Sequence, residues 1–131
     1  MAHDLAAVYR DYLACLNERR WDDLGEFVAD ELSYNGRRLT LADYRALLDA
    51  DTTATPDLRY RAEHLLADGD LVACRLWFEC VPRQRFLGIE PTGVRVSFAE
   101  HVFYRFRQRR IVDVWSLIDK DAVREQMSAG G

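Results

Sequence analysis

The spacing of apolar residues changes near residue 58, and this change constrains the fold of the 131-residue chain more than any other feature. Before it, apolar side chains recur at the spacing of one helix face. After it, they alternate or form continuous runs separated by turn signals, as in strands. The polar segment from Thr52 to Asp57 contains Pro56 and is predicted to be a flexible loop. Helices followed by long strands predict an α+β fold, with helices segregated from an antiparallel sheet.

Caps and turns set the expected limits of these elements. Asp4 can cap a first helix that ends at Asn17, and Thr40 with Asp43 opens a later helix as a capping box. The elements predicted before the loop are helices at 4–17, 21–29 and 40–51 and a short strand at 31–34. Those predicted after it are strands at 58–66, 71–81, 94–106 and 111–118 and a helix at 119–127.

Composition predicts one soluble globular domain over residues 1–131. The formal net charge of −4 and the isoelectric point near 5.3 argue against a nucleic-acid partner, which usually requires a basic excess. We expect no membrane span and no signal peptide, and therefore a cytoplasmic protein. Cys15, Cys74 and Cys80 are odd in number and lack a CxxC spacing, so neither a disulfide framework nor a zinc site is expected.

Ionisable side chains lie along the apolar hairpin formed by the last two strands. Glu100 and His101 are in the middle of the strand 94–106, and Asp119 directly follows the strand 111–118. Carboxylates are costly to bury at such positions unless they are paired or take part in chemistry. These three residues are therefore the candidate catalytic groups.

The register of the hairpin decides which of these groups share a face of the sheet. A two-residue turn at Gln108-Arg109 brings together the side chains of Glu100, Tyr104, Trp115 and Asp119. A three-residue turn with a bulge slips the pairing by one residue and puts His101 with Asp119 instead. The apolar pattern is compatible with both registers, and the first is the one we expect.

Several short motifs of the chain resemble one known family. They are Gly88-Ile89-x-Pro91-Thr92-Gly93, Arg105-Phe106, Arg110-Ile111, Trp115-x-x-x-Asp119 and Gln126. Together they resemble the SnoaL-like polyketide cyclases, also called ester cyclases, of the nuclear-transport-factor-2-like superfamily. The resemblance implies a cone-shaped fold, in which N-terminal helices pack in a strongly curved antiparallel sheet around a pocket that is open at one end.

The resemblance also implies a reaction. In the family, the aspartate that follows the tryptophan of the last strand is the general acid/base of an intramolecular aldol ring closure, and Asp119 holds that position here. A carboxylate can take an acidic proton from carbon and return it to the forming alkoxide without a metal or cofactor. The residues we expect to contact the substrate are Trp115, Tyr34, Asn35, Tyr12, His64, Trp77 and Tyr104.

The chain departs from the family pattern ahead of the glycine-bearing turn. Pro82-Arg83-Gln84-Arg85-Phe86 stands where many relatives carry His-x-Gly-x-Phe, and Glu90 replaces a proline. The aromatic polyketide substrate therefore does not carry over with the motif. The expected substrate is a small apolar carbonyl compound that undergoes cyclisation or isomerisation by proton transfer.

Two other functions remain open at this point. In an epoxide hydrolase-type enzyme, Glu100 and Asp119 would jointly activate water. In a non-catalytic binding or dimerisation module, the pocket would lack a buried carboxylate with a shifted pKa. Whichever of the three functions holds, we expect a homodimer formed through the sheet, because one helical layer cannot cover both apolar faces. The residues we expect on the second apolar face are Val112, Val114, Ile118, Ala99 and Phe103.

Overall fold

The computed structural model describes residues 4–129, which form three α-helices, one 3₁₀-helix and a six-stranded sheet. The helical elements are α1 (Leu5–Asn17), η1 (Trp21–Glu26), α2 (Leu41–Ala54) and α3 (Lys120–Ala129). The strands are β1 (Val28–Tyr34), β2 (Arg37–Thr40), β3 (Arg61–Asp68), β4 (Leu71–Cys80), β5 (Val96–Arg107) and β6 (Arg110–Ile118). The predicted α+β fold is confirmed.

Local sequence signals account for the starts of the two long helices. The Asp4 carboxylate accepts a hydrogen bond of 3.2 Å from the amide of Ala7 and so caps α1. At α2, the Thr40 hydroxyl accepts from the amide of Asp43, and the Asp43 carboxylate accepts from the amide of Thr40. This reciprocal pair is the predicted capping box. None of the helices within residues 4–129 is long and apolar enough to cross a membrane.

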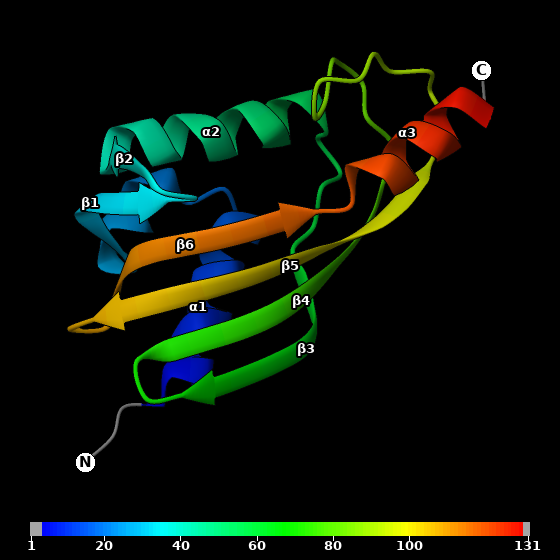
Figure 1. The fold of residues 1–131 in the computed structure, drawn as a ribbon. Helices are drawn as coiled ribbons and strands as arrows, with labels where there is room; N and C mark the ends of the chain where they lie inside the picture. The colour runs from blue at the N-terminus through cyan, green and yellow to red at the C-terminus, as the bar shows by residue number, and fades with distance from the viewer. Residues whose placement is uncertain (1–3, 130–131) are drawn as a thin grey trace.

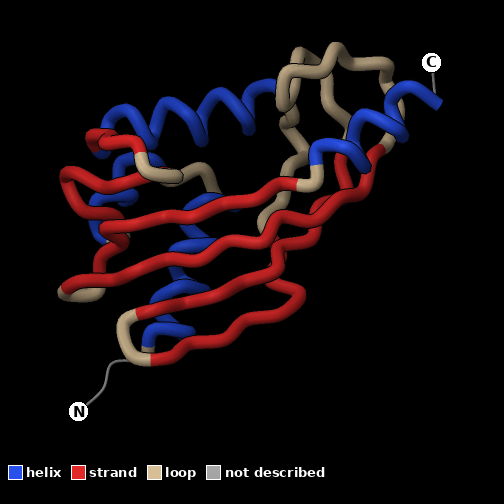
Figure 2. The backbone as a smooth tube through the Cα atoms, viewed as in Figure 1, coloured by secondary structure: helices blue, strands red, loops and turns tan. Residues whose placement is uncertain are grey.

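The sheet has the strand order β2-β1-β6-β5-β4-β3 and curves around the helices. Its neighbouring strands are antiparallel except at β1 and β6, which run parallel. Figures 1 and 2 show α1 behind the sheet and α2 beside the end of the sheet formed by β2 and β1, whereas none of the described helices covers the face turned toward the viewer. We call the helix-facing side the inner face and the opposite side the outer face.

The core lies between α1, α2 and the inner face. Alternation along β4 buries Val72, Cys74, Leu76 and Phe78 and leaves the residues between them on the outer face. The three cysteines are free and buried. At the far end of the sheet, Gln126 of α3 accepts from the amide of Ser97 and donates to its carbonyl, at 2.8 Å and 2.7 Å. Gln126 thus fastens α3 to β5.

The N-terminal region differs from the sequence prediction in two places. The helix predicted at 21–29 is a 3₁₀-helix that ends at Glu26, and β1 begins at Val28 because its backbone pairs with Ile111 of β6. Strand β2 was not predicted. It pairs with β1 across the Asn35-Gly36 turn, where both residues have positive φ angles. The pairing of β1 with β6, which no local signal reports, decides the first difference, whereas the second is a hairpin that the Asn35-Gly36 turn signals locally.

A β-bulge in β6 overturns the expected hairpin register. The turn at Gln108-Arg109 does have two residues, both with positive φ, so that Arg107 pairs with Arg110. Phe106 then pairs with Ile111 but Arg105 pairs with Asp113, which leaves Val112 as an extra residue. Beyond this bulge every side chain of β6 lies on the face opposite to the expected one.

Candidate functional site

A small cavity lies between α1, α2 and the inner face of the sheet. Its volume is about 60 Å³, which is room for about two water molecules. Five tyrosines line it, namely Tyr12, Tyr34, Tyr44, Tyr60 and Tyr104. Leucine, isoleucine and valine side chains complete the wall, and two carboxyl groups, those of Glu100 and Asp51, also line it. An apolar cavity with a few polar groups is the usual form of a small-molecule site.

Glu100 lies in the middle of β5 and lines the cavity. The Ser116 hydroxyl donates a hydrogen bond of 2.5 Å to its Oε2 atom. Burial raises the pKa of Glu100, the Ser116 hydrogen bond opposes this rise, and the nearby charge of Asp51 adds to it. Within residues 4–129, Glu100 forms no salt bridge. A buried carboxylate without a counterion is suited to proton transfer.

Ser116 reaches Glu100 because of the bulge at Val112. The bulge pairs Ser116 with Val102 on the inner face, where the expected register would have placed Trp115. The backbone of Ser116 is held by Asn35, whose side chain accepts from the Ser116 amide at 2.8 Å and donates to its carbonyl at 3.2 Å. Asn35, predicted to contact substrate, does not line the cavity and instead positions Ser116.

Asp51 is the functional candidate that the sequence reasoning missed. It lies in the last turns of α2, and burial raises its pKa to about 6. Its position follows Tyr44 and Leu48 at the spacing of one helix face, and both of those residues are buried. That spacing was the available signal. The sequence prediction uses Asp51 only as the last residue of the helix 40–51.

The cavity tyrosines supply neutral hydroxyl groups. Tyr12 and Tyr44 share a hydrogen bond of 2.7 Å between their hydroxyls, and the Tyr9 hydroxyl donates to that of Tyr104 at 3.3 Å. Burial raises the pKa values of Tyr12, Tyr44 and Tyr104, so these phenols keep their protons. In the Tyr12–Tyr44 pair, the hydroxyl that accepts still has its own hydrogen to donate.

The structure brings together four of the predicted site residues. Glu100, Tyr12, Tyr34 and Tyr104 all line the inner cavity. The others, apart from Asn35, belong to the outer face or its edge. They are His101, Trp115, Asp119, His64 and Trp77.

The expectation that Asp119 points into an apolar cavity beside Trp115 is wrong. Asp119 is exposed, and its Oδ1 atom accepts a hydrogen bond of 3.1 Å from the amide of Ala122, so it caps α3. The physical cause is again the bulge at Val112, which turns Trp115 and the residues after it outward. His101 and Asp119 do lie on the same face, as the alternative register required, and they line one open depression.

Polar groups on the outer face are bonded to one another. Arg75 lies 2.6 Å from the Nε2 atom of His101 and also binds Glu63. The Trp77 indole donates to Glu79, and the guanidinium of Arg105 lies 5.5 Å from the centre of the Trp115 ring. The expected role of Trp77, His64 and His101 at an inner pocket therefore has no geometric basis, because the sheet separates them from Glu100.

The second apolar face also has a different composition from the one predicted. Val114 is buried on the inner face and Ile118 lines the inner cavity, so neither contributes to the outer face. The large apolar side chains exposed near or on the outer face are Leu66, Phe103, Trp115 and Leu117. Leu117 is 79% exposed.

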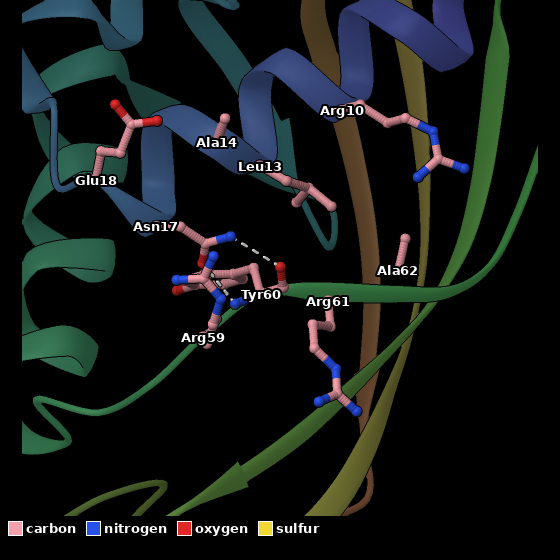
Figure 3. A pocket seen from close by; sticks show the side chains of 9 residues that line it. All are labelled: Arg10, Leu13, Ala14, Asn17, Glu18, Arg59, Tyr60, Arg61 and Ala62. Carbon is pink, nitrogen blue, oxygen red and sulfur yellow. Dashed lines mark hydrogen bonds between the residues drawn. The ribbon is translucent and has the colours of Figure 1, made fainter.

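A larger groove between α1 and β3 is a weaker candidate. Figure 3 shows this groove, which has a volume of about 460 Å³ and is bordered by Arg10, Arg59 and Arg61. The side-chain amide of Asn17 at its wall already has partners within the protein, since it accepts a hydrogen bond from the amide of Tyr60 and donates one to the Tyr60 carbonyl. All three arginines are exposed to solvent. The inner cavity, which contains buried ionisable groups, is therefore the candidate active site.

A curved sheet that encloses a cavity lined by two partly buried carboxyl groups places this protein among the cone-shaped α+β proteins that contain a pocket. Residues 6–127 match the family described as SnoaL-like polyketide cyclase, and the chain belongs to this family. The fold is accordingly the nuclear-transport-factor-2-like cone. A comparison with curated proteins found no match.

Solved structures agree with this assignment. A SnoaL-like polyketide cyclase from Agrobacterium tumefaciens is 43% identical, with a TM-score of 0.91 over 95% of this chain and 98% of that one. IdmH from Streptomyces antibioticus is 20% identical, with a TM-score of 0.85 over 96% and 99%. TsrD from Streptomyces laurentii is 19% identical, with a TM-score of 0.86 over 98% and 99%. The last two similarities establish the fold alone.

Proposed function

We propose that this protein is a cofactor-independent, cyclase-like enzyme that transfers protons within a small apolar carbonyl compound, with Glu100 as the base. The observation that carries the proposal is the Glu100 carboxyl group, which lines an apolar, tyrosine-rich cavity without a cationic partner among the described residues. Family membership supports the same class of reaction. The proposal moves the role of base from Asp119 to Glu100.

The chemistry needs only groups that line the cavity. The Oε1 atom of Glu100 is free of the Ser116 hydrogen bond and would take a proton from carbon next to a carbonyl group. The enolate oxygen would accept a hydrogen bond from a tyrosine hydroxyl, such as that of the Tyr12–Tyr44 pair. The enolate can then take the proton back at a different carbon, which is isomerisation. Alternatively, its nucleophilic carbon attacks a second carbonyl of the same molecule. In the second case, Glu100 returns the proton to the new alkoxide.

The size of the cavity favours a small reacting group. About 60 Å³ is far below the roughly 300–1,000 Å³ of sites that enclose drug-sized ligands. We therefore propose that only the carbonyl end of the substrate enters, and that the rest lies near Leu47, which lines the cavity and is 46% exposed.

Proton abstraction can be tested without the natural substrate. Simple β-dicarbonyl compounds are first screened for thermal stabilisation of the protein, and exchange of their α-hydrogens for deuterium is then followed by NMR. We expect the protein to accelerate the exchange and Glu100→Gln to abolish the acceleration. Glu79→Gln, on the outer face, is the matched control. Ligand binding without exchange would favour the non-catalytic binding module.

The epoxide hydrolase-type alternative loses its structural basis. Glu100 lies on the inner face and Asp119 caps α3 at the other face, so the two carboxylates cannot activate one water molecule together. Epoxides remain useful in the ligand screen as a negative comparison.

We also propose that the protein forms a homodimer through the outer face. Phe103 and Leu117 project from neighbouring strands of this face and are 52% and 79% exposed. Apolar patches of this kind usually mark interaction sites. A second copy can cover the same patch about a two-fold axis, which is the commonest arrangement of homo-oligomers.

The free cysteines are compatible with the reducing cytoplasm, where we propose the enzyme works.

A further inference from the structure

The inner cavity contains a second carboxyl group, that of Asp51, to which neither the sequence motifs nor the family match assigns a role. Asp51 comes from α2 and Glu100 from β5, so the two groups enter the cavity from opposite layers. They line a space that holds about two water molecules. Two carboxylates in such a space repel each other, and the second proton is lost less readily than the first.

The surroundings do not offset this repulsion. The ionisable groups nearest to the two carboxyls on the packed elements are Tyr12 of α1, Tyr34 of β1, Tyr44 of α2, Tyr60 ahead of β3, Cys74 of β4 and Tyr104 of β5. All of them are neutral when protonated. Arg19, which lies near Tyr60, donates its hydrogen bonds to the backbone carbonyls of Leu16, Pro56 and Leu58. Within residues 4–129, Asp51 forms no salt bridge.

We propose that Asp51 and Glu100 form a catalytic pair that shares one proton, with Glu100 as the base and protonated Asp51 as the acid. This inference rests on the proposed function, which assigns the base to Glu100. As Glu100 takes a proton from carbon, Asp51 gives its proton to the carbonyl oxygen, and an enol forms. When the enol carbon attacks a second carbonyl, Asp51 takes back the enol proton and Glu100 protonates the new alkoxide. Both groups then return to their starting states.

The division of roles follows from hydrogen bonding and from helix geometry. The Ser116 hydroxyl donates to Glu100 and stabilises its ionised form. Asp51 lies in the last turns of α2. The partial negative charge at this end of the helix disfavours the ionised form of the Asp51 side chain. These two interactions favour the form in which Asp51 holds the proton and Glu100 is ionised, which is the form that reacts, whereas the deeper burial of Glu100 favours the form with the proton on Glu100.

The pair can be tested without a substrate by NMR titration of the full-length protein with ¹³C-labelled carboxyl groups. We expect Asp51→Asn to lower the pKa of Glu100, and Glu100→Gln to lower that of Asp51, each by about one unit, which is the threshold of strong coupling. Asp49→Asn is the matched control, because it removes an exposed carboxylate from the same part of α2 and should leave Glu100 unchanged. A Glu100 titration that is the same in wild type and Asp51→Asn would overturn the pair.

The deuterium-exchange assay separates this inference from the proposed function. If the titrations are coupled but Glu100→Gln keeps full exchange, the proton-sharing pair stands and its catalytic role is wrong. If Glu100→Gln abolishes exchange but the titrations are independent, the proposed function stands and the pair is wrong. If the titrations are coupled and Glu100→Gln abolishes exchange, Asp51→Asn should slow the exchange at least tenfold. The decrease in exchange rate that wild type shows at high pH, where Asp51 loses its proton, should also disappear in this variant. Unchanged exchange in Asp51→Asn would exclude Asp51 as the acid.

Discussion

The Ser116 hydroxyl donates a hydrogen bond to the carboxylate of Glu100 because one extra residue, Val112, is inserted into the strand that carries it. Without that insertion, the pleat would put Trp115 on the inner face and turn Ser116 outward. The bulge therefore replaces an indole with a hydroxyl beside the proposed base. β-Bulges frequently re-aim a side chain next to an active site in this way.

The most direct prediction concerns Glu100 itself. Glu100→Gln keeps the shape of the side chain and removes the base, so it should slow deuterium exchange of a β-dicarbonyl compound at least a hundredfold, which is typical of losing a general base. The fold should be retained, as checked by circular dichroism. Full exchange activity in this variant would exclude Glu100 as the base.

Removing the hydroxyl of Ser116 should raise the pKa of Glu100. The hydrogen bond stabilises the carboxylate and opposes the effect of burial, so Ser116→Ala loses the opposing contribution. The expected result is an acidic limb of the pH–rate profile that moves to higher pH. An unchanged limb would mean that the hydrogen bond does not act on the base.

Asp51 should make the protein less stable as the pH rises. Its pKa is raised from 3.8 to about 6 on folding, so its destabilising effect is absent below the unfolded value and complete above the folded one. The loss between pH 4 and 6 is at most roughly 3 kcal/mol. Urea unfolding should show that the free energy of unfolding of wild type falls between pH 4 and pH 6 and that Asp51→Asn lacks this fall. Asp49→Asn should show the same fall as wild type.

Asp119 should matter for stability and not for catalysis. It caps α3 from an exposed position, so Asp119→Ala should cost about 1 kcal/mol of unfolding free energy. Asp119→Asn, which can still cap the helix, should cost little and keep full exchange activity. Loss of exchange in Asp119→Asn, with the fold intact, would return the catalytic role to this residue.

A charge placed on the outer face should prevent the proposed dimer. Leu117→Lys adds a lysine at the most exposed large apolar side chain and should give a folded monomer in sedimentation experiments at micromolar concentration, where wild type is expected to be a dimer. Ala42→Lys, on the exposed side of α2, is the control for added charge. A monomeric wild type under the same conditions would contradict the dimer.

The sequence predicted best those features that depend on neighbouring residues. The caps at Asp4 and Thr40 and the two-residue turn at Gln108-Arg109 are local, and the structure confirms them. The bulge at Val112 has no such signal, because no glycine or proline marks it and both faces of β6 are apolar. A single unmarked residue therefore reversed the predicted faces of Trp115 and Ser116.

Motif spacing alone was a poor guide to the site for the same reason. The Trp115-x-x-x-Asp119 motif is present, yet Trp115 and Asp119 are both exposed. Glu100 was a candidate because carboxylates are rare in apolar strands, and that physical argument led to the cavity. Asp51 shares a helix face with Tyr44 and Leu48, but the sequence did not show that this face of α2 lines the same cavity as Glu100.

The two hydrogen bonds between the Asn35 side chain and the backbone of Ser116 connect the protein surface to the proposed base. Asn35 is exposed in a tight turn, yet its amide replaces a strand neighbour for both backbone groups of Ser116. Whatever moves this turn, whether a substitution, an insertion or a bound partner, also moves the hydroxyl that opposes the burial-induced rise in the pKa of Glu100. The acidity of the reaction centre can thus be adjusted by natural variation or by design at a position that substrate never touches.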